Sequence, residues 1–188
     1  SVGAGGEIGR FLKRSAVLKG YQLTEIDIDG QRCPDIVADI CETAVDGCYD
    51  FIVLIEVLEH VLKPRAAVEN LGKALSSSGK IVGSTPFIFP IHDEPRDHFR
   101  FTRFQLKSLF EQFREFEIEE KSGLFETMVV LLSRAALSDN KLLRIFATPI
   151  NLGLLIWWPI ARLCDCIFPT RFAPIGYCFS ASSPDFAC

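Results

Sequence analysis

A glycine-rich turn close to the first residue has the composition of a ligand-binding loop. Gly3, Gly5 and Gly6 lead into a predicted helix over residues 6–19. Glycine lets a ligand approach the backbone closely, and the N-terminus of a helix offers free N–H groups. The dinucleotide pattern G-x-G-x-x-G is incomplete, because Ile8 occupies the third glycine position. The turn alone is therefore equally consistent with a ligand site and with a plain tight turn.

Aspartates follow the next two predicted strands. Asp27 lies at the end of a predicted strand over residues 21–28, about twenty residues after the glycine turn, where a carboxylate can accept hydrogen bonds from both ribose hydroxyls. Asp29 is a competitor for this role. Asp39 ends a short predicted strand over residues 35–38, and it could accept a hydrogen bond from an adenine amino group or simply cap a turn. Together with the glycine turn, these acids indicate an adenosine-type ligand.

Two acids and a histidine follow a continuous apolar run. Phe51–Ile55 is rich in β-branched residues, as in a central parallel strand covered on both faces. Glu56, Glu59 and His60 come directly after it, but the zinc protease patterns H-E-x-x-H and H-x-x-E-H are not present. The acids are also favourable at a helix N-terminus, so this segment is equally an ordinary strand-end turn.

The loop after His92 gathers nitrogen and oxygen side chains. His92, Asp93, Asp97 and His98 would be the ligands of a metal-dependent hydrolase. The alternative is a loop that is held by internal ion pairs and hydrogen bonds, and the pattern favours this alternative. We therefore predict no metal site.

The seven cysteines are scattered, and their spacing contains no C-x-x-C pair. Their odd number and the absence of metal spacing indicate reduced thiols of a cytosolic protein. The pair Cys164-x-Cys166 alone is a weak metal pattern. No signal peptide is recognisable, so the predicted localisation is cytoplasmic.

The charge balance divides the chain into two parts. The net charge of −4 and the pI of about 5.4 exclude a general nucleic-acid binder. Residues 1–120 carry 14 Lys and Arg against 20 Asp and Glu, a charge of −6, and residues 121–188 carry 6 against 4, a charge of +2. The second part is also the more apolar, so the two parts are expected to differ in role.

Predicted strands alternate with predicted helices, which is typical of an α/β doubly wound, mostly parallel sheet. Such sheets bind ligands beyond the carboxyl ends of their strands. The glycine turn, Asp27, Asp39 and Glu56 all fall at such ends. Besides the segments already given, we expect helices over residues 65–75, 102–113 (with Thr102 as N-cap) and 125–136, and strands over residues 80–84, 115–121 and 176–182.

Three segments together strongly resemble class I S-adenosylmethionine-dependent methyltransferases, and more narrowly the methyltransferase type 11 group. The run Tyr49–Val61 resembles their fourth strand and the turn that follows, and Leu75–Phe87 resembles a helix end, a small-residue turn and a strand that runs into Thr-Pro-Phe. A subset of the group continues with a motif matched by His92-x-x-Pro95-x-Asp97-x-x-Arg100-x-Thr102. The resemblance covers about residues 1–122, and a last, antiparallel strand at residues 175–182 fits it too.

The resemblance implies a Rossmann-like fold, S-adenosylmethionine as cofactor, and direct methyl transfer to an oxygen, nitrogen or carbon atom. The candidate general bases are His60 and His92, although each is equally suited to holding a loop. The implied cofactor contacts are Gly3, Gly5 and Gly6 for the methionine part, Asp27 for the ribose, Ile28, Asp39 and Ile40 for the adenine, and the backbone near Glu56 for the pocket wall.

The chain departs from the group at its N-terminus. Ser1 stands where an acid is usual, and the first strand and the preceding helix are missing. We therefore expect the natural protein to extend further upstream and this chain to bind the cofactor weakly or not at all. Two alternatives follow: a non-catalytic or cofactor-deficient binding module, and an NAD-type Rossmann enzyme.

The apolar C-terminal stretch is expected to form a helical insert over residues 123–174 of a single domain, 1–188. Ile145–Ala161 carries no formal charge, but it is interrupted by Pro149, Asn151, Gly153 and Pro159, so a membrane-spanning helix is disfavoured. We predict a cover over the active-site mouth that selects a small-molecule or glycolipid-type substrate. The alternative is a peripheral membrane contact through residues 145–168, including two tryptophans. The sequence does not predict an oligomeric state.

Overall fold

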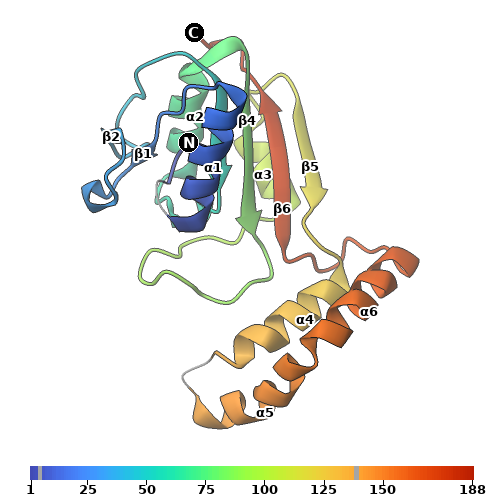
Figure 1. The fold of residues 1–188 in the computed structure, drawn as a ribbon. Coiled ribbons are helices and arrows are strands. Elements are labelled where there is room, and N and C mark those ends of the chain that lie inside the picture. Colours follow the sequence, from blue (N-terminus) through green and yellow to red (C-terminus); the bar gives the residue numbers. More distant parts are fainter. Residues whose placement is uncertain (4–5, 138–139) are drawn as a thin grey trace.

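The computed structural model describes residues 1–3, 6–137 and 140–188 (Figure 1). A central sheet carries helices on both faces, and a helical arm extends beyond one end of the sheet. The helices are α1 (Gly6–Lys19), α2 (Pro64–Lys73), α3 (Arg103–Leu109), α4 (Leu124–Ala135), α5 (Lys141–Leu152) and α6 (Leu154–Ile167). The strands are β1 (Ile26–Asp27), β2 (Ile36–Val37), β3 (Tyr49–Ile55), β4 (Leu75–Pro86), β5 (Phe116–Glu120) and β6 (Gly176–Ser182).

The sheet is mixed, with parallel strands on one side and an antiparallel strand near the other edge. Strands β1 and β2 pair in parallel, β3 and β4 pair in parallel, and β6 runs antiparallel between β4 and β5. Val2 joins the two groups, because it forms parallel bridges with Ile26 on one side and Leu54 on the other. The predicted fold, with its antiparallel last strand, is confirmed.

The core lies where β3 and β4 meet α2 and α3. Leu54 and Ile81 on the central strands, Leu71 on α2 and Leu106 on α3 are fully buried. Burying such side chains contributes roughly 1.5–3 kcal/mol each, which explains why the apolar runs form the inner strands. Phe110 stacks on Phe116 of β5 and contacts Phe179 of β6, so aromatic rings complete the core under the antiparallel strands.

Helix α1 forms over the predicted residues but packs less closely than its sequence suggests. Its apolar positions Phe11 and Val17 are 69% and 80% exposed, whereas Ala16 is buried. The helix lies on the face of the sheet opposite α2 and α3 (Figure 1). Strands β1 and β2 have only two residues each and offer little surface to cover it.

Several element ends differ from the predicted ones. Strand β1 contains only Ile26–Asp27, whereas the sequence predicted eight residues. Helix α3 ends at Leu109, four residues before the predicted end at residue 113. Strand β4 starts earlier than predicted, because Leu75 already pairs with Tyr49. The predicted N-cap is confirmed, since Thr102 Oγ1 accepts a hydrogen bond from the Gln105 N–H at 3.2 Å.

Helices α4, α5 and α6 form the arm, which extends from the end of the sheet toward which β4 points (Figure 1). Asp165 on α6 accepts hydrogen bonds from the backbone N–H groups of Phe125 and Glu126 at the start of α4, which ties the two helices together. The predicted interruption at Gly153 is confirmed, because α5 and α6 separate there, whereas Pro149 and Pro159 lie inside the two helices and end neither. No helix within the described ranges has the length and apolar character needed to cross a membrane.

The prediction of seven reduced cysteines is wrong at one pair, because Cys48 and Cys188 form a disulfide. The pairing depends on the sheet. Tyr49 opens β3 beside Leu75, and the Leu75 carbonyl accepts a hydrogen bond from the Cys188 N–H, which brings the two cysteines together across 140 residues of sequence. The other five cysteines are free thiols, Cys164 and Cys166 among them.

Candidate functional site

The glycine turn lies between β1 and β3. The Gly3 N–H donates to the Ile26 carbonyl at 2.9 Å, and Gly3 has a φ of +82°, a conformation that favours glycine. A Cβ atom at this position would lie 3.1 Å from the Val57 side chain. The turn therefore needs glycine both for its conformation and for its close approach to the segment after β3. Gly6 is the first residue of α1, and Gly5 lies outside the described residues.

Asp27 is buried at the end of β1, directly beside the glycine turn. Its Oδ1 accepts a hydrogen bond from the Asp29 N–H at 2.8 Å, and its Oδ2 lies 3.4 Å from Arg32 Nη1. The competitor Asp29 is more exposed and uses its side chain to accept the Gln31 N–H within its own turn. Asp27 is thus the buried acid at the carboxyl end of β1.

The remaining predicted adenine contacts differ in their accessibility. Ile28 is 53% exposed and offers an apolar surface next to Asp27, whereas Ile40 is buried in the core. Asp39 accepts a hydrogen bond from the Cys41 N–H at 2.8 Å and so caps a turn, the alternative role that the sequence left open.

Glu56 connects three strand ends. It has a left-handed φ of +52° directly after β3. Its Oε1 accepts hydrogen bonds from Ser84 Oγ on β4 at 2.6 Å and from Lys121 Nζ after β5 at 2.8 Å. The side chain therefore ties the segments after β3 and β5 to β4, while its backbone lies at the edge predicted to border the cofactor.

These residues fit an adenosine-containing cofactor. A Cβ at Gly3 would make a tight contact with its neighbour, an acid lies beside the turn at Asp27, and an exposed apolar side chain follows at Ile28. A ribose needs hydrogen-bond acceptors and an adenine ring needs an apolar surface, so the chemistry of these positions matches the ligand.

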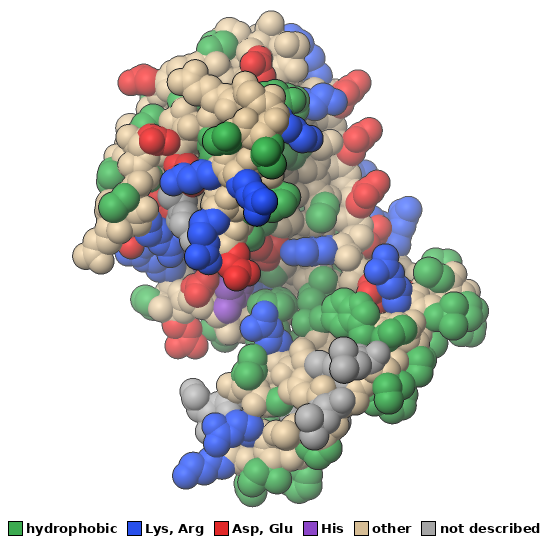
Figure 2. Space-filling model, viewed as in Figure 1, with side chains coloured by type: hydrophobic (Ala, Val, Ile, Leu, Met, Phe, Trp, Pro, Cys, Tyr) green, Lys and Arg blue, Asp and Glu red, His purple; other side chains and the backbone are tan. Residues whose placement is uncertain are grey.

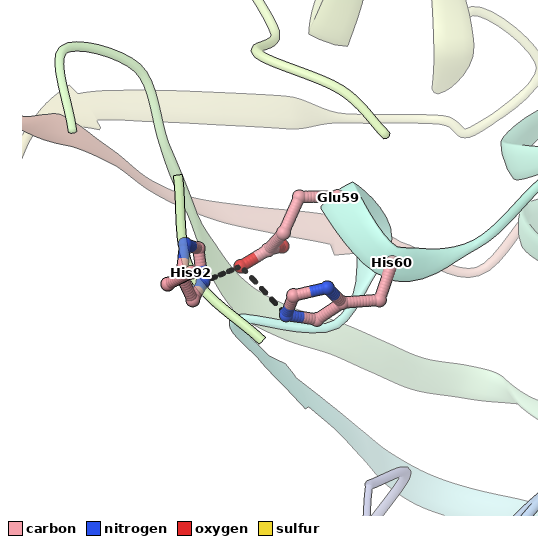
Figure 3. A group of neighbouring side chains, drawn as sticks. All are labelled: Glu59, His60 and His92. Carbon is pink, nitrogen blue, oxygen red and sulfur yellow. Dashed lines mark ion pairs between the residues drawn. The ribbon is translucent and has the colours of Figure 1, made fainter. Parts of the chain in front are cut away.

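A second cluster lies at the same end of the sheet (Figure 3). Glu59 and His60 belong to a single turn of 3₁₀ helix after β3, and His92 comes from the loop after β4. The Glu59 Oε1 atom lies 3.9 Å from His60 Nε2 and 3.8 Å from His92 Nε2, and the two rings meet edge-on with centroids 5.0 Å apart. The structure thus brings together the two histidines that the sequence proposed separately as bases.

Glu59 is the member of this cluster that sequence reasoning missed. The side chain is fully buried, and neither carboxylate oxygen accepts a hydrogen bond from any described residue. Burial raises the pKa of this carboxyl group to about 8, with Glu56 contributing in the same direction. The sequence pattern that could have revealed Glu59 is E-x-x-E-H. Two acids are also common at a helix N-terminus, and no local pattern indicates that His92 lies beside this segment.

The loop between His92 and Arg100 is held by its own ion pairs and hydrogen bonds, as the alternative to a metal site predicted. Arg100 forms an ion pair with buried Asp97, and this guanidinium holds the pKa of Asp97 well below its usual range. Asp97 also accepts the His92 N–H at 2.9 Å, while the Glu59 carbonyl accepts the N–H groups of His98 and Phe99. The four proposed ligands of the hydrolase alternative therefore do not converge; the loop instead presents His92 toward Glu59.

A separate cavity of about 600 Å³ opens between α2 and α3, lined by residues such as Arg65, Glu69, Phe101 and Gln105. None of the predicted site residues lines it. We therefore place the candidate site at the carboxyl ends of β1, β3 and β4.

The family comparison agrees with this geometry. The sequence profile described as "Methyltransferase domain" matches residues 4–121, more than half of the chain. The chain belongs to this family. The matched range contains every predicted cofactor-binding residue except Gly3. It also contains the cluster of Glu59, His60 and His92. Comparison with curated proteins gave no match.

Solved methyltransferase structures show the same fold. Phosphoethanolamine N-methyltransferase 2 of Haemonchus contortus, in complex with phosphomonomethylethanolamine and S-adenosylhomocysteine, has 16% identity and a TM-score of 0.60 over 98% of this chain and 48% of that enzyme. A SAM-dependent methyltransferase of Archaeoglobus fulgidus has 17% identity and a TM-score of 0.59, covering 96% of this chain and 83% of that one. The N-methyltransferase NodS of Bradyrhizobium japonicum, bound to S-adenosylhomocysteine, has 18% identity and a TM-score of 0.52 over 98% and 77%. The chain spans about half the length of the Haemonchus enzyme.

The predicted class is confirmed, and the cofactors of these neighbours agree with the predicted S-adenosylmethionine. The methyltransferase domain has the class I Rossmann-like fold. The narrower type 11 assignment and the roles of individual site residues stay predictions.

Proposed function

We propose that this methyltransferase domain transfers the methyl group of S-adenosylmethionine directly to an oxygen, nitrogen or carbon atom of an acceptor. The observation that carries the proposal is the junction of the left-handed Gly3 turn with buried Asp27 in a chain that belongs to a methyltransferase family. A donor with an adenosine end and an amino-acid end fits this junction.

The chain's residues would act mainly by binding and alignment. S-adenosylmethionine supplies a methyl group on a sulfonium, so transfer needs no group activation by the protein, and alignment with exclusion of water is worth up to about 7–11 kcal/mol in favourable cases. Gly3 and Asp27 would hold the donor, and Glu56 would keep the pocket wall fixed through Ser84 and Lys121.

His60 and His92 are suited to accept a proton from the acceptor group. Their Nε2 atoms both point toward Glu59 Oε1, at the carboxyl ends of β3 and β4. A general base of this kind contributes roughly 10²–10⁴-fold in rate.

Equilibrium binding tests the cofactor assignment against its alternatives. Titration calorimetry with S-adenosylhomocysteine, S-adenosylmethionine and NAD should show binding of the first two. Asp27→Asn should weaken S-adenosylhomocysteine binding by roughly 10–100-fold, because charge-assisted hydrogen bonds worth about 1.5–3 kcal/mol are lost. Asp29→Asn is the matched control and should leave the affinity unchanged. NAD binding would favour the NAD-type alternative, and no binding of any of the three would favour a cofactor-deficient module.

For the acceptor, we propose a lipid-linked substrate at an anionic membrane surface. The arm turns large apolar side chains outward, Trp157, Trp158 and Ile156 among them, and its buried described side chains are small, namely Thr127, Ala136 and Ala161. Small residues between helices and large apolar residues outside are typical of helices packed in a lipid environment. The arm therefore resembles an interfacial membrane contact more than the cover predicted from the sequence.

The charges of the arm support the same surface. The exposed basic residues are Lys141, Arg144 and Arg162 on the arm and Arg171 just after it. Figure 2 shows basic side chains beside the apolar surface of the arm. The acid Asp165 is used internally at the start of α4. Basic residues next to exposed tryptophans favour an anionic lipid surface.

Vesicle sedimentation tests the membrane proposal. The protein should bind vesicles of phosphatidylcholine with phosphatidylserine more strongly than vesicles of phosphatidylcholine alone. Trp157→Ser with Trp158→Ser should lower binding by about tenfold or more, since each large apolar side chain contributes roughly 1.5–3 kcal/mol when buried. Tyr21→Ser, an exposed aromatic residue outside the arm, should have no effect. Equal binding by all variants would contradict the proposal.

A further inference from the structure

We propose that Glu59, His60 and His92 bind a divalent transition-metal ion of the Zn²⁺ type. Each side chain offers one ligand atom, and the three atoms lie within 4.8 Å of one another. Two imidazole nitrogens and one carboxylate oxygen are a donor set that Zn²⁺ and Fe²⁺ accept, whereas Mg²⁺ and Ca²⁺ prefer oxygen ligands alone. Small rotamer changes of the three side chains would shorten the distances between their ligand atoms enough for all three to coordinate one ion.

The outer nitrogens of both histidines have partners of the kind that metal ligands have. His60 Nδ1 lies 2.9 Å from the Arg96 carbonyl oxygen, and His92 Nδ1 lies 3.3 Å from the Asp97 carboxylate. A proton on each Nδ1 leaves the Nε2 lone pair free, and both Nε2 atoms point toward Glu59. Two histidines from different segments are therefore oriented in the same way toward one point.

The Glu59 carboxylate supplies an independent observation. It is fully buried, and neither of its oxygens accepts a hydrogen bond from a described residue. A buried polar group without a partner costs roughly 1–3 kcal/mol, so native proteins retain one where something else satisfies it. A cation between the carboxylate and the two imidazoles would do so.

The loop architecture explains why the sequence pattern did not reveal this site. Its ligands come from a turn after β3 and from a loop after β4, whereas the sequence analysis considered these two segments as separate metal patterns. The Arg100–Asp97 ion pair and the hydrogen bonds from the loop backbone to the Glu59 carbonyl hold His92 in place. The site is thus built from contacts that fix both segments.

Three protein ligands leave a coordination position open at the carboxyl ends of the strands. With a metal bound, the Nε2 atoms of His60 and His92 would be ligands and could not act as general bases. The ion would instead orient an acceptor hydroxyl and lower its pKa, a role that rests on the proposed methyl transfer. Metal binding itself does not depend on that activity, so the two proposals are tested by separate measurements.

The experiment uses protein without a histidine tag, stripped of metal by chelation and dialysed. Calorimetry with Zn²⁺ should show one site, and Co²⁺ substitution should give visible absorption of nitrogen and oxygen coordination without intense thiolate charge-transfer bands. That absence separates this site from the five free thiols. S-adenosylhomocysteine affinity, measured on the same samples, reports on the cofactor site separately.

His92→Ala and Glu59→Gln should each lower Zn²⁺ affinity by at least about tenfold, because loss of an outer-shell partner alone costs roughly 10–100-fold. His98→Ala is the matched control, since His98 is exposed, lies in the same loop and is the remaining histidine of the chain. Circular dichroism checks that each variant is folded, and His60→Ala replaces any variant that is not. Zn²⁺ binding that is absent, or that is equal in the His92 and His98 variants, would overturn the proposal.

Discussion

In the sheet core Leu54 on β3 and Leu71 on α2 are fully buried, whereas in the arm Trp157 and Trp158 of α6 are 54% and 43% exposed. Both regions are rich in apolar residues, but the core places large side chains between layers and the arm places them outside. The core therefore derives its stability from internal packing, and its rigidity holds the site residues at the strand ends. The arm keeps small residues inside and leaves its large ones available to a partner surface.

The arm is nevertheless held firmly at its base. Asp165 binds the start of α4, the Ser122 hydroxyl accepts the Ile175 N–H, and the Arg134 guanidinium lies 5.1 Å from the Phe89 ring in the loop after β4. The same loop carries His92. Arg134 of the arm therefore contacts the same loop that carries His92.

The largest expected effect is in the core. Leu54→Ala should lower the free energy of unfolding by roughly 2–5 kcal/mol, because it removes a fully buried side chain from the central strand and leaves a cavity. Urea unfolding measures the change. Leu163→Ala on α6, where the side chain is 61% exposed, is the control and should change stability by less than about 0.5 kcal/mol. Similar losses for both variants would mean that the arm is packed as tightly as the core.

The disulfide sharpens the comparison, because it joins Cys188, after β6, to Cys48, before β3, and so links two segments of the core and not of the arm. Cys48→Ser should lower the free energy of unfolding by roughly 2–4 kcal/mol, because the Cys48–Cys188 bond closes a long loop of the unfolded chain. Cys33→Ser, at an exposed free thiol, should be nearly neutral. Titration of the unreduced protein with a thiol reagent, after full unfolding, should find five reactive groups; seven would rule out the disulfide.

The glycine turn tests how closely the core controls the site. Gly3→Ala should cost roughly 1–3 kcal/mol of stability, because it puts a side chain in a left-handed conformation and places its Cβ 3.1 Å from Val57. It should also weaken S-adenosylhomocysteine binding. Gly20→Ala has a similar φ of +70° but open space around it, so it should reproduce the strain and leave binding unchanged. If both variants bind equally, the turn is structural only.

The smallest expected effect on stability is at the outer surface of the arm. Trp157→Ser with Trp158→Ser should change the free energy of unfolding by less than about 0.5 kcal/mol per residue, because both side chains are substantially exposed. The same double variant is the one expected to lose vesicle binding. A large loss of stability in solution would show that the tryptophans pack within the protein.

Local patterns predicted much of the fold. The spacing of apolar residues located α1 and α4, the β-branched run located β3, and Thr102 located the start of α3. The last strand was predicted at residues 176–182, where β6 lies. These features depend on neighbours within a few residues, and hydrogen bonding and periodic burial act on that scale.

The candidate site was partly predictable for the same reason. Gly3 belongs to a glycine turn before a predicted helix, and Asp27 ends the next predicted strand about twenty residues later. This order of residue types was enough to indicate an adenosine-containing ligand. The packing of α1 was not predictable in this way. Its apolar residues matched a helix period, but how far they are buried depends on the short strands β1 and β2 beneath them.

The sequence by itself determined the class of fold, the order of its strands and helices, and the residues at the carboxyl ends of those strands, because each is encoded in local spacing. Only the tertiary structure decided which distant side chains meet. The β3–β4 pairing brought Cys188 to Cys48, and the ion-paired loop after β4 brought His92 to Glu59 and His60. It also decided that the arm buries small residues and exposes its tryptophans. Each of these outcomes depends on long-range packing, which no short window of sequence contains.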